Sequence, residues 1–167
     1  MLCRRPPRLY DGCYLGARSV FFTMCTFERR SYFLDFRVGA RLCEQLLSTA
    51  TRYDVEVVAY CFMPDHLHLL VEGRREGADI RKWTGAFRRV SGFHFRQEFG
   101  QRLWQDGCYD RVLRKEEAML SVAKYIVLNP VRAGLCADAG AYPLLGSSRF
   151  ERSELLTASD WYPPSRG

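Results

Sequence analysis

Residues 60–72 read YCFMPDHLHLLVE and hold two of the three histidines of this 167-residue chain, His66 and His68. The apolar residues around them predict a β-strand, whose side chains alternate between two faces. His66 and His68 therefore share one face of the predicted strand, and Leu67 and Leu69 share the other. Two imidazoles on one face suit a divalent metal ion, because imidazole is the commonest protein ligand for metals. The alternative is a pair of polar residues on the solvated face of an antiparallel strand.

The segments on either side of the histidines alternate between predicted strands and predicted helices. Aromatic and β-branched residues predict strands at 19–26, 55–62 and 66–71, and within 103–113. Apolar residues at steps of three and four predict helices at 36–53, directly after Asp79, and at 115–128. This order fits an α+β fold, a ferredoxin-like split β-α-β sandwich with an antiparallel central sheet that carries the histidines. We expect the helices on one face of that sheet, the 115–128 helix included.

The composition indicates a globular protein with one main domain. Hydrophobic residues make up 47% of the chain and aromatic residues 14%, which is enough for a substantial core. We expect a basic amino-terminal arm at 1–18, the main domain at 19–150 and a tail at 151–167. No apolar run has the length of a membrane span, and the amino terminus lacks an apolar signal core, so we expect a cytoplasmic protein.

The positive charge of the chain is concentrated in one segment. The formal net charge is +6, and residues 74–102 contain eight basic residues against three acidic ones. Such a local excess is typical of proteins that bind a phosphate backbone. The alternative is an ordinary solvated helix face.

The helix predicted from residue 115 carries a polar pair beside its apolar stripe. Tyr125 falls on the flank of that stripe, and Asn129, four residues later, lies over the same side. A phenol can attack phosphorus, and an amide oxygen can bind a hard divalent cation. Alternatively, Tyr125 is a partly buried structural residue and Asn129 caps a short turn that begins at Pro130.

Two segments of the chain resemble the REP-associated tyrosine transposases, a branch of the single-tyrosine HUH nucleases. These segments are YCFMPDHLHLLVEG at 60–73 and YIVLNPVRAGL at 125–135. Residues 20–33 and 103–114 are similar to the same family, and residues 142–149 resemble a degraded form of its closing Tyr-Pro-x-Ser-Ser-Tyr segment. The resemblance runs in the order of the family from about residue 8 to residue 150.

The resemblance implies a catalytic domain with a four-residue site. His66 and His68 would be the metal pair, Asn129 the third protein ligand for Mg²⁺ or Mn²⁺, and Tyr125 the nucleophile. Tyr125 would displace a 3′-hydroxyl and become linked to the 5′-phosphate, which nicks the DNA and stores the bond for rejoining. The implied substrate is single-stranded DNA with palindromic hairpins, as in REP elements. The resemblance also favours a monomer over a dimer, in a prokaryotic cell and associated with the nucleoid.

Basic residues in two regions are candidates for phosphate contacts. One group lies on the helix after Asp79, and the other flanks the proposed site. The candidates are Arg81, Lys82, Arg88, Arg89, Arg111, Arg114 and Arg132. Asp110 could anchor one of the arginines beside the site or support a metal ligand.

The chain departs from the family pattern at two places. Asp65 stands where many relatives have asparagine, which adds a negative charge beside the metal pair. The closing segment contains an inserted Leu144-Leu145-Gly146, and Phe150 replaces tyrosine. Two other functions remain compatible with these residues. One is a non-catalytic nucleic-acid binder that kept the fold, and the other is a metal phosphodiesterase that uses water, with Tyr125 structural.

Overall fold

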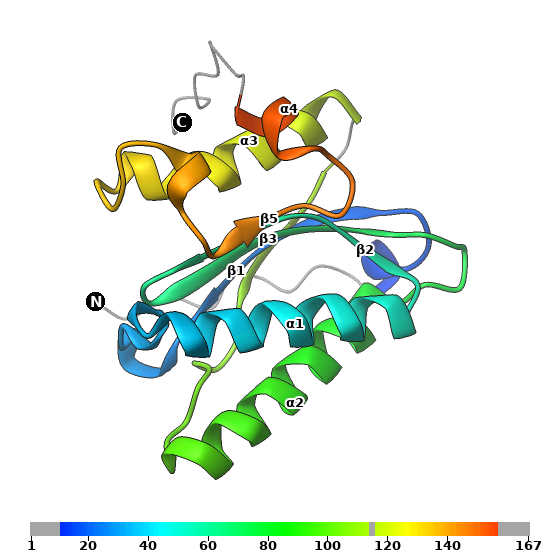
Figure 1. The fold of residues 1–167 in the computed structure, drawn as a ribbon. Helices are drawn as coiled ribbons and strands as arrows, with labels where there is room; N and C mark the ends of the chain where they lie inside the picture. The colour runs from blue at the N-terminus through cyan, green and yellow to red at the C-terminus, as the bar shows by residue number, and fades with distance from the viewer. Residues whose placement is uncertain (1–10, 114–115, 157–167) are drawn as a thin grey trace.

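The computed structural model describes residues 11–113 and 116–156, which form a five-stranded sheet between helices (Figure 1). The strands are β1 (Ser19–Cys25), β2 (Val55–Met63), β3 (His66–Gly73), β4 (Tyr109–Val112) and β5 (Leu145–Gly146). The α-helices are α1 (Phe36–Arg52), α2 (Ile80–Phe99), α3 (Glu116–Arg132) and α4 (Arg152–Leu156). Short 3-10 turns occur at Asp11–Tyr14, Phe27–Arg29, Tyr32–Leu34 and Ala139–Ala141. None of the helices in the described parts of the chain has the length and apolar character needed to cross a membrane.

The sheet has the order β4-β1-β3-β2-β5, and every neighbouring pair is antiparallel. The chain order β1-α1-β2-β3-α2-β4 with this strand order is the ferredoxin-like arrangement, so the predicted fold class is confirmed. Strand β3, which carries both histidines, lies between β1 and β2 at the centre of the sheet. Because β3 is hydrogen-bonded to a strand on each side, the backbone that carries the two histidines is held on both edges.

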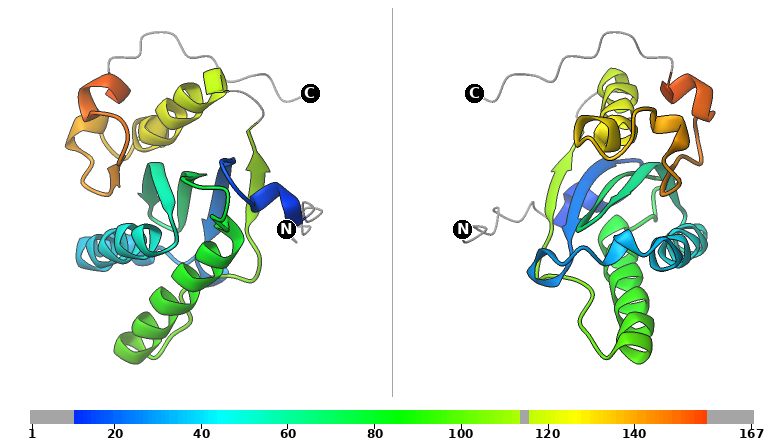
Figure 2. Two further views of the ribbon diagram at one scale, coloured as in Figure 1. Left: turned by 90° about the vertical axis from the view of Figure 1, so that its right-hand side faces the viewer. Right: turned by 60° about the vertical axis from the view of Figure 1, so that its left-hand side comes forward.

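The helices lie on both faces of the sheet, and this differs from the expected single helical face (Figure 2). Helices α1 and α2 pack on one face, against β3 side chains such as Leu67 and Leu69. Helix α3 packs on the other face, against Leu70 of β3 and Cys61 of β2. The reason is that β2 and β3 carry apolar side chains on both faces, so each face needs a cover. The helix with Tyr125 therefore lies on the face opposite to α1 and α2.

Capping residues set the bounds of the two helices on the first face. The Asp35 side chain accepts a hydrogen bond from the Arg37 N–H at the start of α1. Asp79 accepts one from the Lys82 N–H at the start of α2, which begins directly after Asp79, as the sequence predicted. Helix α2 ends at Gly100, whose φ of 65° is the left-handed conformation that glycine adopts without strain.

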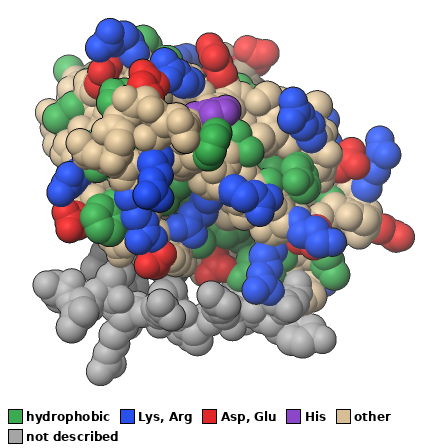
Figure 3. Space-filling model, turned by 90° about the horizontal axis from the view of Figure 1, so that it is seen from below, with side chains coloured by type: hydrophobic (Ala, Val, Ile, Leu, Met, Phe, Trp, Pro, Cys, Tyr) green, Lys and Arg blue, Asp and Glu red, His purple; other side chains and the backbone are tan. Residues whose placement is uncertain are grey.

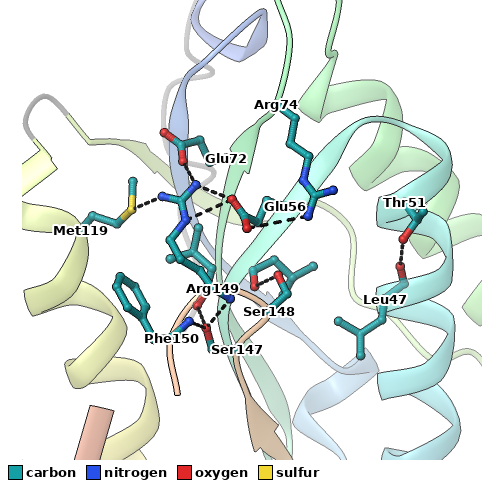
Figure 4. Close-up of polar contacts among 12 residues, drawn as sticks. Leu47, Thr51, Glu56, Glu72, Arg74, Met119, Ser147, Ser148, Arg149 and Phe150 are labelled. Atoms are coloured by element: carbon teal, nitrogen blue, oxygen red, sulfur yellow. Dashed lines mark hydrogen bonds and ion pairs between the residues drawn. The ribbon is translucent and has the colours of Figure 1, made fainter. Parts of the chain in front are cut away.

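The closing segment ties the carboxyl end of the domain to the sheet, as Figure 4 shows. Arg149 contacts both Glu56 of β2 and Glu72 of β3. The hydroxyls of Ser147 and Ser148 donate to backbone carbonyls of β2. Helix α4 belongs to the segment that we predicted as a tail, and its Leu155 is buried against the α3 layer. Residues 157–167 of that tail and residues 1–10 of the predicted arm lie outside the described residues.

Candidate active site

His66 and His68 form a close pair on the α3 face of the sheet. Their ring planes stand at 85° with centroids 4.6 Å apart, and the two Nε2 atoms lie 3.1 Å from each other. Strand β1 pairs with β3 so that Cys25 lies opposite His66 and Thr23 opposite His68. Both rings are half-buried, and their Nε2 atoms lie close together. The strand alternation predicted from the sequence thus places the two imidazoles side by side.

Each histidine has a polar neighbour at its other ring nitrogen. Oδ1 of Asp65 lies 2.6 Å from Nδ1 of His66, and Oγ1 of Thr23 lies 3.1 Å from Nδ1 of His68. When both Nδ1–H groups donate to these oxygens, both Nε2 lone pairs are free for a ligand. The second oxygen of Asp65 lies 2.9 Å from Nε of Arg29, so the charge that this carboxylate adds is paired.

The environment keeps both imidazoles in the neutral form that binds metals. Burial lowers the pKa of His68 to about 3, and the neighbouring His66 and Arg29 act in the same direction. Burial also lowers the pKa of His66, although the Asp65 carboxylate opposes this effect. Both rings are therefore neutral near pH 7 and carry a lone pair.

Helix α3 brings Tyr125 to the histidine pair. The centroid of the Tyr125 ring lies 6.1 Å from that of His68, with 64° between the ring planes. The guanidinium carbon of Arg132 lies 5.0 Å from the centroid of the Tyr125 ring. Tyr125 lies partly exposed beside the apolar side chains that α3 buries against the sheet, as its flank position predicts. The phenol, the two imidazoles and one cation thus lie together, although His68 and Tyr125 are 57 positions apart in the sequence.

Asn129 lies one helical turn beyond Tyr125 and directly before Pro130, which stands inside α3. Proline has no N–H to donate to the Ile126 carbonyl four residues earlier. The side-chain nitrogen of Asn129 lies 2.8 Å from the Tyr125 carbonyl oxygen and 3.5 Å from that of Ile126, so this nitrogen donates to the helix backbone. The helix therefore continues to Arg132, past the predicted end at residue 128. The amide oxygen of Asn129 is the end that is left for a cation.

The histidine pair fits a divalent metal ion that completes its coordination with oxygen. Two ligand atoms at right angles, each about 2.1 Å from an ion, lie about 3 Å apart. The Nε2 atoms of His66 and His68, at 3.1 Å, match that spacing. Within the described residues, no three His, Cys, Asp or Glu side chains are grouped to hold an ion. Among the described residues, the further ligands that remain are of another kind, such as the amide oxygen of Asn129, and water or a phosphate can complete the set.

The candidate phosphate contacts divide between the two faces of the sheet. Arg111 of β4 pairs with Phe21 on the histidine face, and Arg132 lies beside Tyr125. Arg114 lies outside the described residues. The candidates on α2 lie in the layer that covers the opposite face; they are Arg81, Lys82, Arg88 and Arg89. Figure 3 shows that face, where Lys and Arg side chains alternate with acidic ones.

Arg88 and Lys82 have structural partners near α2. The Arg88 guanidinium donates to the Gln105 carbonyl, and Lys82 lies 3.7 Å from Asp79. Asp110 accepts a hydrogen bond from the Tyr14 hydroxyl on the α1–α2 side of the sheet. Our expectation that Asp110 supports a metal ligand, or anchors Arg111 or Arg132, is therefore wrong, because its side chain points to the other face.

Several site neighbours were not predicted from the sequence. The Phe21 ring stacks on His68 at 5.8 Å with 20° between the planes, and Tyr109 contacts the Phe21 ring at 6.4 Å. Thr23 and Arg29 support the histidines as described above. The only available signal was the alternation within β1, which puts Phe21 and Thr23 on one face but does not say which strand they pair with.

Comparisons with known proteins match the chain in sequence and in fold. A family model described as "Transposase IS200 like" matches residues 18–128. A curated Haemophilus influenzae protein with the provisional name REP-associated tyrosine transposase is 26% identical over 153 residues, which cover 84% of this chain and 85% of that protein. A solved REP-associated tyrosine transposase bound to a REP hairpin superposes with a TM-score of 0.75 at 21% identity, over 97% of this chain and 96% of its own. A provisionally named transposase of Deinococcus radiodurans R1 gives 0.51 at 21% identity, over 75% and 95%.

Proposed function

Since this chain belongs to the family of IS200-like transposases, we propose that it nicks and rejoins single-stranded DNA through a covalent bond to Tyr125. The observation that carries the proposal is the distance of 6.1 Å between the rings of Tyr125 and His68. A tyrosine with a purely structural role has no need of a neutral imidazole pair and a cation beside it. The chemistry that this group of residues supports best is attack on a phosphodiester.

The residues divide the reaction between them. His66, His68 and the amide oxygen of Asn129 would hold Mg²⁺ or Mn²⁺, and the ion would supply polarisation of the scissile phosphate. The Tyr125 oxygen attacks phosphorus, so a P–O bond to tyrosine forms and the bond from phosphorus to the 3′ oxygen breaks. The phenol proton passes to solvent, and the departing 3′ oxygen takes one up. Arg132, beside the phenol, balances negative charge on the transferred phosphate.

The reaction is reversible without an outside energy source, because one phosphodiester is exchanged for another. A 3′-hydroxyl that attacks the phosphotyrosine restores the DNA bond and frees Tyr125. This exchange of one phosphodiester for another fits an enzyme that rejoins DNA. A hydrolase would instead transfer the phosphate to water, and the DNA bond could not be restored without an energy source.

The protein works as a monomer in this proposal. His66, His68 and Tyr125 come together within one chain, so a second copy has no residue to add to this group. We expect the molar mass in solution to be that of one chain. We also expect adduct formation to remain complete at dilutions that dissociate weak dimers.

The proposed substrate is single-stranded DNA that carries a palindromic hairpin. A solved relative of the same fold is described as bound to a REP hairpin, and the curated relative bears the same association in its name. In our proposal Arg111 and Arg132 contact phosphates of the DNA strand at the reaction centre. The α2 cations, on the opposite layer, meet only outlying parts of the backbone.

The test is a denaturing gel after incubation with hairpin-bearing single-stranded DNA and Mg²⁺. We expect a protein–DNA adduct for the wild type. Tyr125→Phe should bind the same DNA with unchanged affinity and give no adduct, and the control Tyr53→Phe, at an exposed tyrosine after α1, should behave as wild type. Free nicked DNA from Tyr125→Phe would instead support a water-using phosphodiesterase. A mobility shift without any cleavage by the wild type would support a non-catalytic binder.

A further inference from the structure

Strand β4 presents an exposed tyrosine on the same face as the histidine pair. Tyr109 is 48% exposed, although it belongs to a strand of the central sheet. Its backbone partner is Thr23 on β1, and the partner of Thr23 on β3 is His68. The three residues form one row across adjacent strands, with side chains on one face. Since neighbouring strands lie about 4.8 Å apart, the backbone of Tyr109 lies about 10 Å from that of His68.

Aromatic contacts connect Tyr109 to the site. Phe21 stacks on His68 and meets the Tyr109 ring at 69°, an edge-to-face contact. Phe21 is buried, so it supports the tyrosine from the side of the core. The exposed part of the Tyr109 ring is therefore held at a fixed place on the rim of the site and remains open to a ligand.

The same strand carries a cation on this face of the sheet. Arg111 lies two residues further along β4, on the same face and exposed. In the part of the chain that the structure describes, Arg111 forms no ion pair or hydrogen bond through its side chain. The strand β4 is also the edge of the sheet, so nothing in the described sheet covers it from outside. An exposed aromatic ring next to a solvated arginine is the combination that binds single-stranded nucleic acid.

We propose that Tyr109 stacks on one base of the DNA next to the scissile phosphate, and that Arg111 meets the backbone phosphate of that nucleotide. The inference rests on the proposed function and adds a nucleotide subsite to it. Stacking accepts any base, so the subsite holds the strand in place beside Tyr125 without reading its sequence. The phenol hydroxyl of Tyr109 has no role in this binding.

The experiment measures equilibrium binding of single-stranded oligonucleotides in a Tyr125→Phe background, where no adduct forms. The cut position is first mapped from the wild-type adduct. One oligonucleotide is intact, and others lack a single base at one of the positions that flank the cut. Tyr109→Ala should weaken binding of the intact oligonucleotide by about 5- to 150-fold, the usual effect of losing one stacked base. Tyr109→Phe should bind within about twofold of the parent, since the ring face is kept.

The abasic oligonucleotides separate stacking from misfolding. For the oligonucleotide that lacks the stacked base, Tyr109→Ala and its parent should have equal affinities, because no base is left to stack. A fold defect would instead weaken binding of every oligonucleotide alike and overturn the subsite. The subsite alone is also overturned if Tyr109→Ala binds the intact strand as well as its parent does. If the wild type neither binds nor cleaves single-stranded DNA, the proposed function is overturned and the subsite with it.

Discussion

Oδ1 of Asp65 lies 2.6 Å from Nδ1 of His66, the next residue in the chain. The other carboxylate oxygen is held by Arg29, at 2.9 Å. Arg29 and the preceding Glu28 have φ of 56° and 54°, a left-handed conformation that costs energy in residues other than glycine. The buried Thr26 holds this loop to the site, since its N–H and its hydroxyl both donate to the Asp65 carbonyl. The loop therefore fixes the carboxylate that orients His66.

Removing this carboxylate should weaken metal binding. We expect Asp65→Ala to lower Mn²⁺ affinity about 10- to 100-fold, because partners of a metal-binding histidine set its tautomer and ring orientation. Asp65→Asn should lose less, since its amide oxygen still accepts from Nδ1–H. Calorimetric titration of the DNA-free protein measures both, with the exposed Asp106→Ala as the control. Equal affinities for Asp65→Ala and the control would show that the carboxylate does not orient a metal ligand.

The sequence predicted four of the five strands of the sheet, but neither β5 nor the layer that α3 occupies. Alternation placed His66 and His68 on one face of β3 correctly. In β2, a bulge between Val57 and Ala59 changes which residues face each side, so Val57 packs with α1 and α2 while Ala59 packs with α3. A bulge leaves no periodic signal in an apolar run, so the sequence did not show which residues of β2 face each helical layer.

The site residues could be grouped from the sequence only through the resemblance to a family. Periodicity put Tyr125 on the flank of its helix, which agrees with its place near His68. The residues that hydrogen-bond to the histidines could not be identified from the sequence. Thr23 and His68, for example, are 45 residues apart and meet only through strand register. Arg29 belongs to a loop whose left-handed backbone leaves no pattern in the sequence.

The two groups of cations should differ in their effect on chemistry. We expect Arg111→Gln to lower the slope of log affinity against log salt by about 0.7, the value for one contact with a single strand. It should also slow adduct formation at saturating DNA, because Arg111 lies on the face of the site. Arg89→Gln, on α2, should leave that rate unchanged, whatever it does to affinity. Single-turnover kinetics over a salt series measure both quantities. A slower rate for Arg89→Gln than for Arg111→Gln would contradict the division of roles.

Acid should destabilise the metal-free protein through His68. Its folded pKa, about 3, lies below the ordinary value of 6.5, so the unfolded chain binds a proton more readily than the folded one. The stabilisation is fully present above pH 6.5 and is lost as the pH falls toward 3. The slope is at most about 1.4 kcal/mol per pH unit for one proton. We expect urea unfolding of His68→Asn to depend less on pH in this range than unfolding of the wild type. Identical pH profiles would exclude a buried, neutral His68.

Arg149 should stabilise the fold by separating two carboxylates. Its guanidinium lies between Glu56 and Glu72, whose side chains are only 15% and 19% exposed (Figure 4). Arg149→Ala would leave these carboxylates close together without their shared cation, at a cost of about 1–3 kcal/mol in the free energy of unfolding.

A second change identifies the cause of that loss. Glu72→Gln in the Arg149→Ala background removes one of the two charges, so it should recover part of the lost stability, whereas Glu72→Gln alone should be destabilising because it removes an acceptor for Arg149. Urea unfolding of the four proteins gives the coupling energy directly. Additive effects would mean that Arg149 acts through its packing on Met119, with its Nη1 2.8 Å from Sδ, and not through its charge.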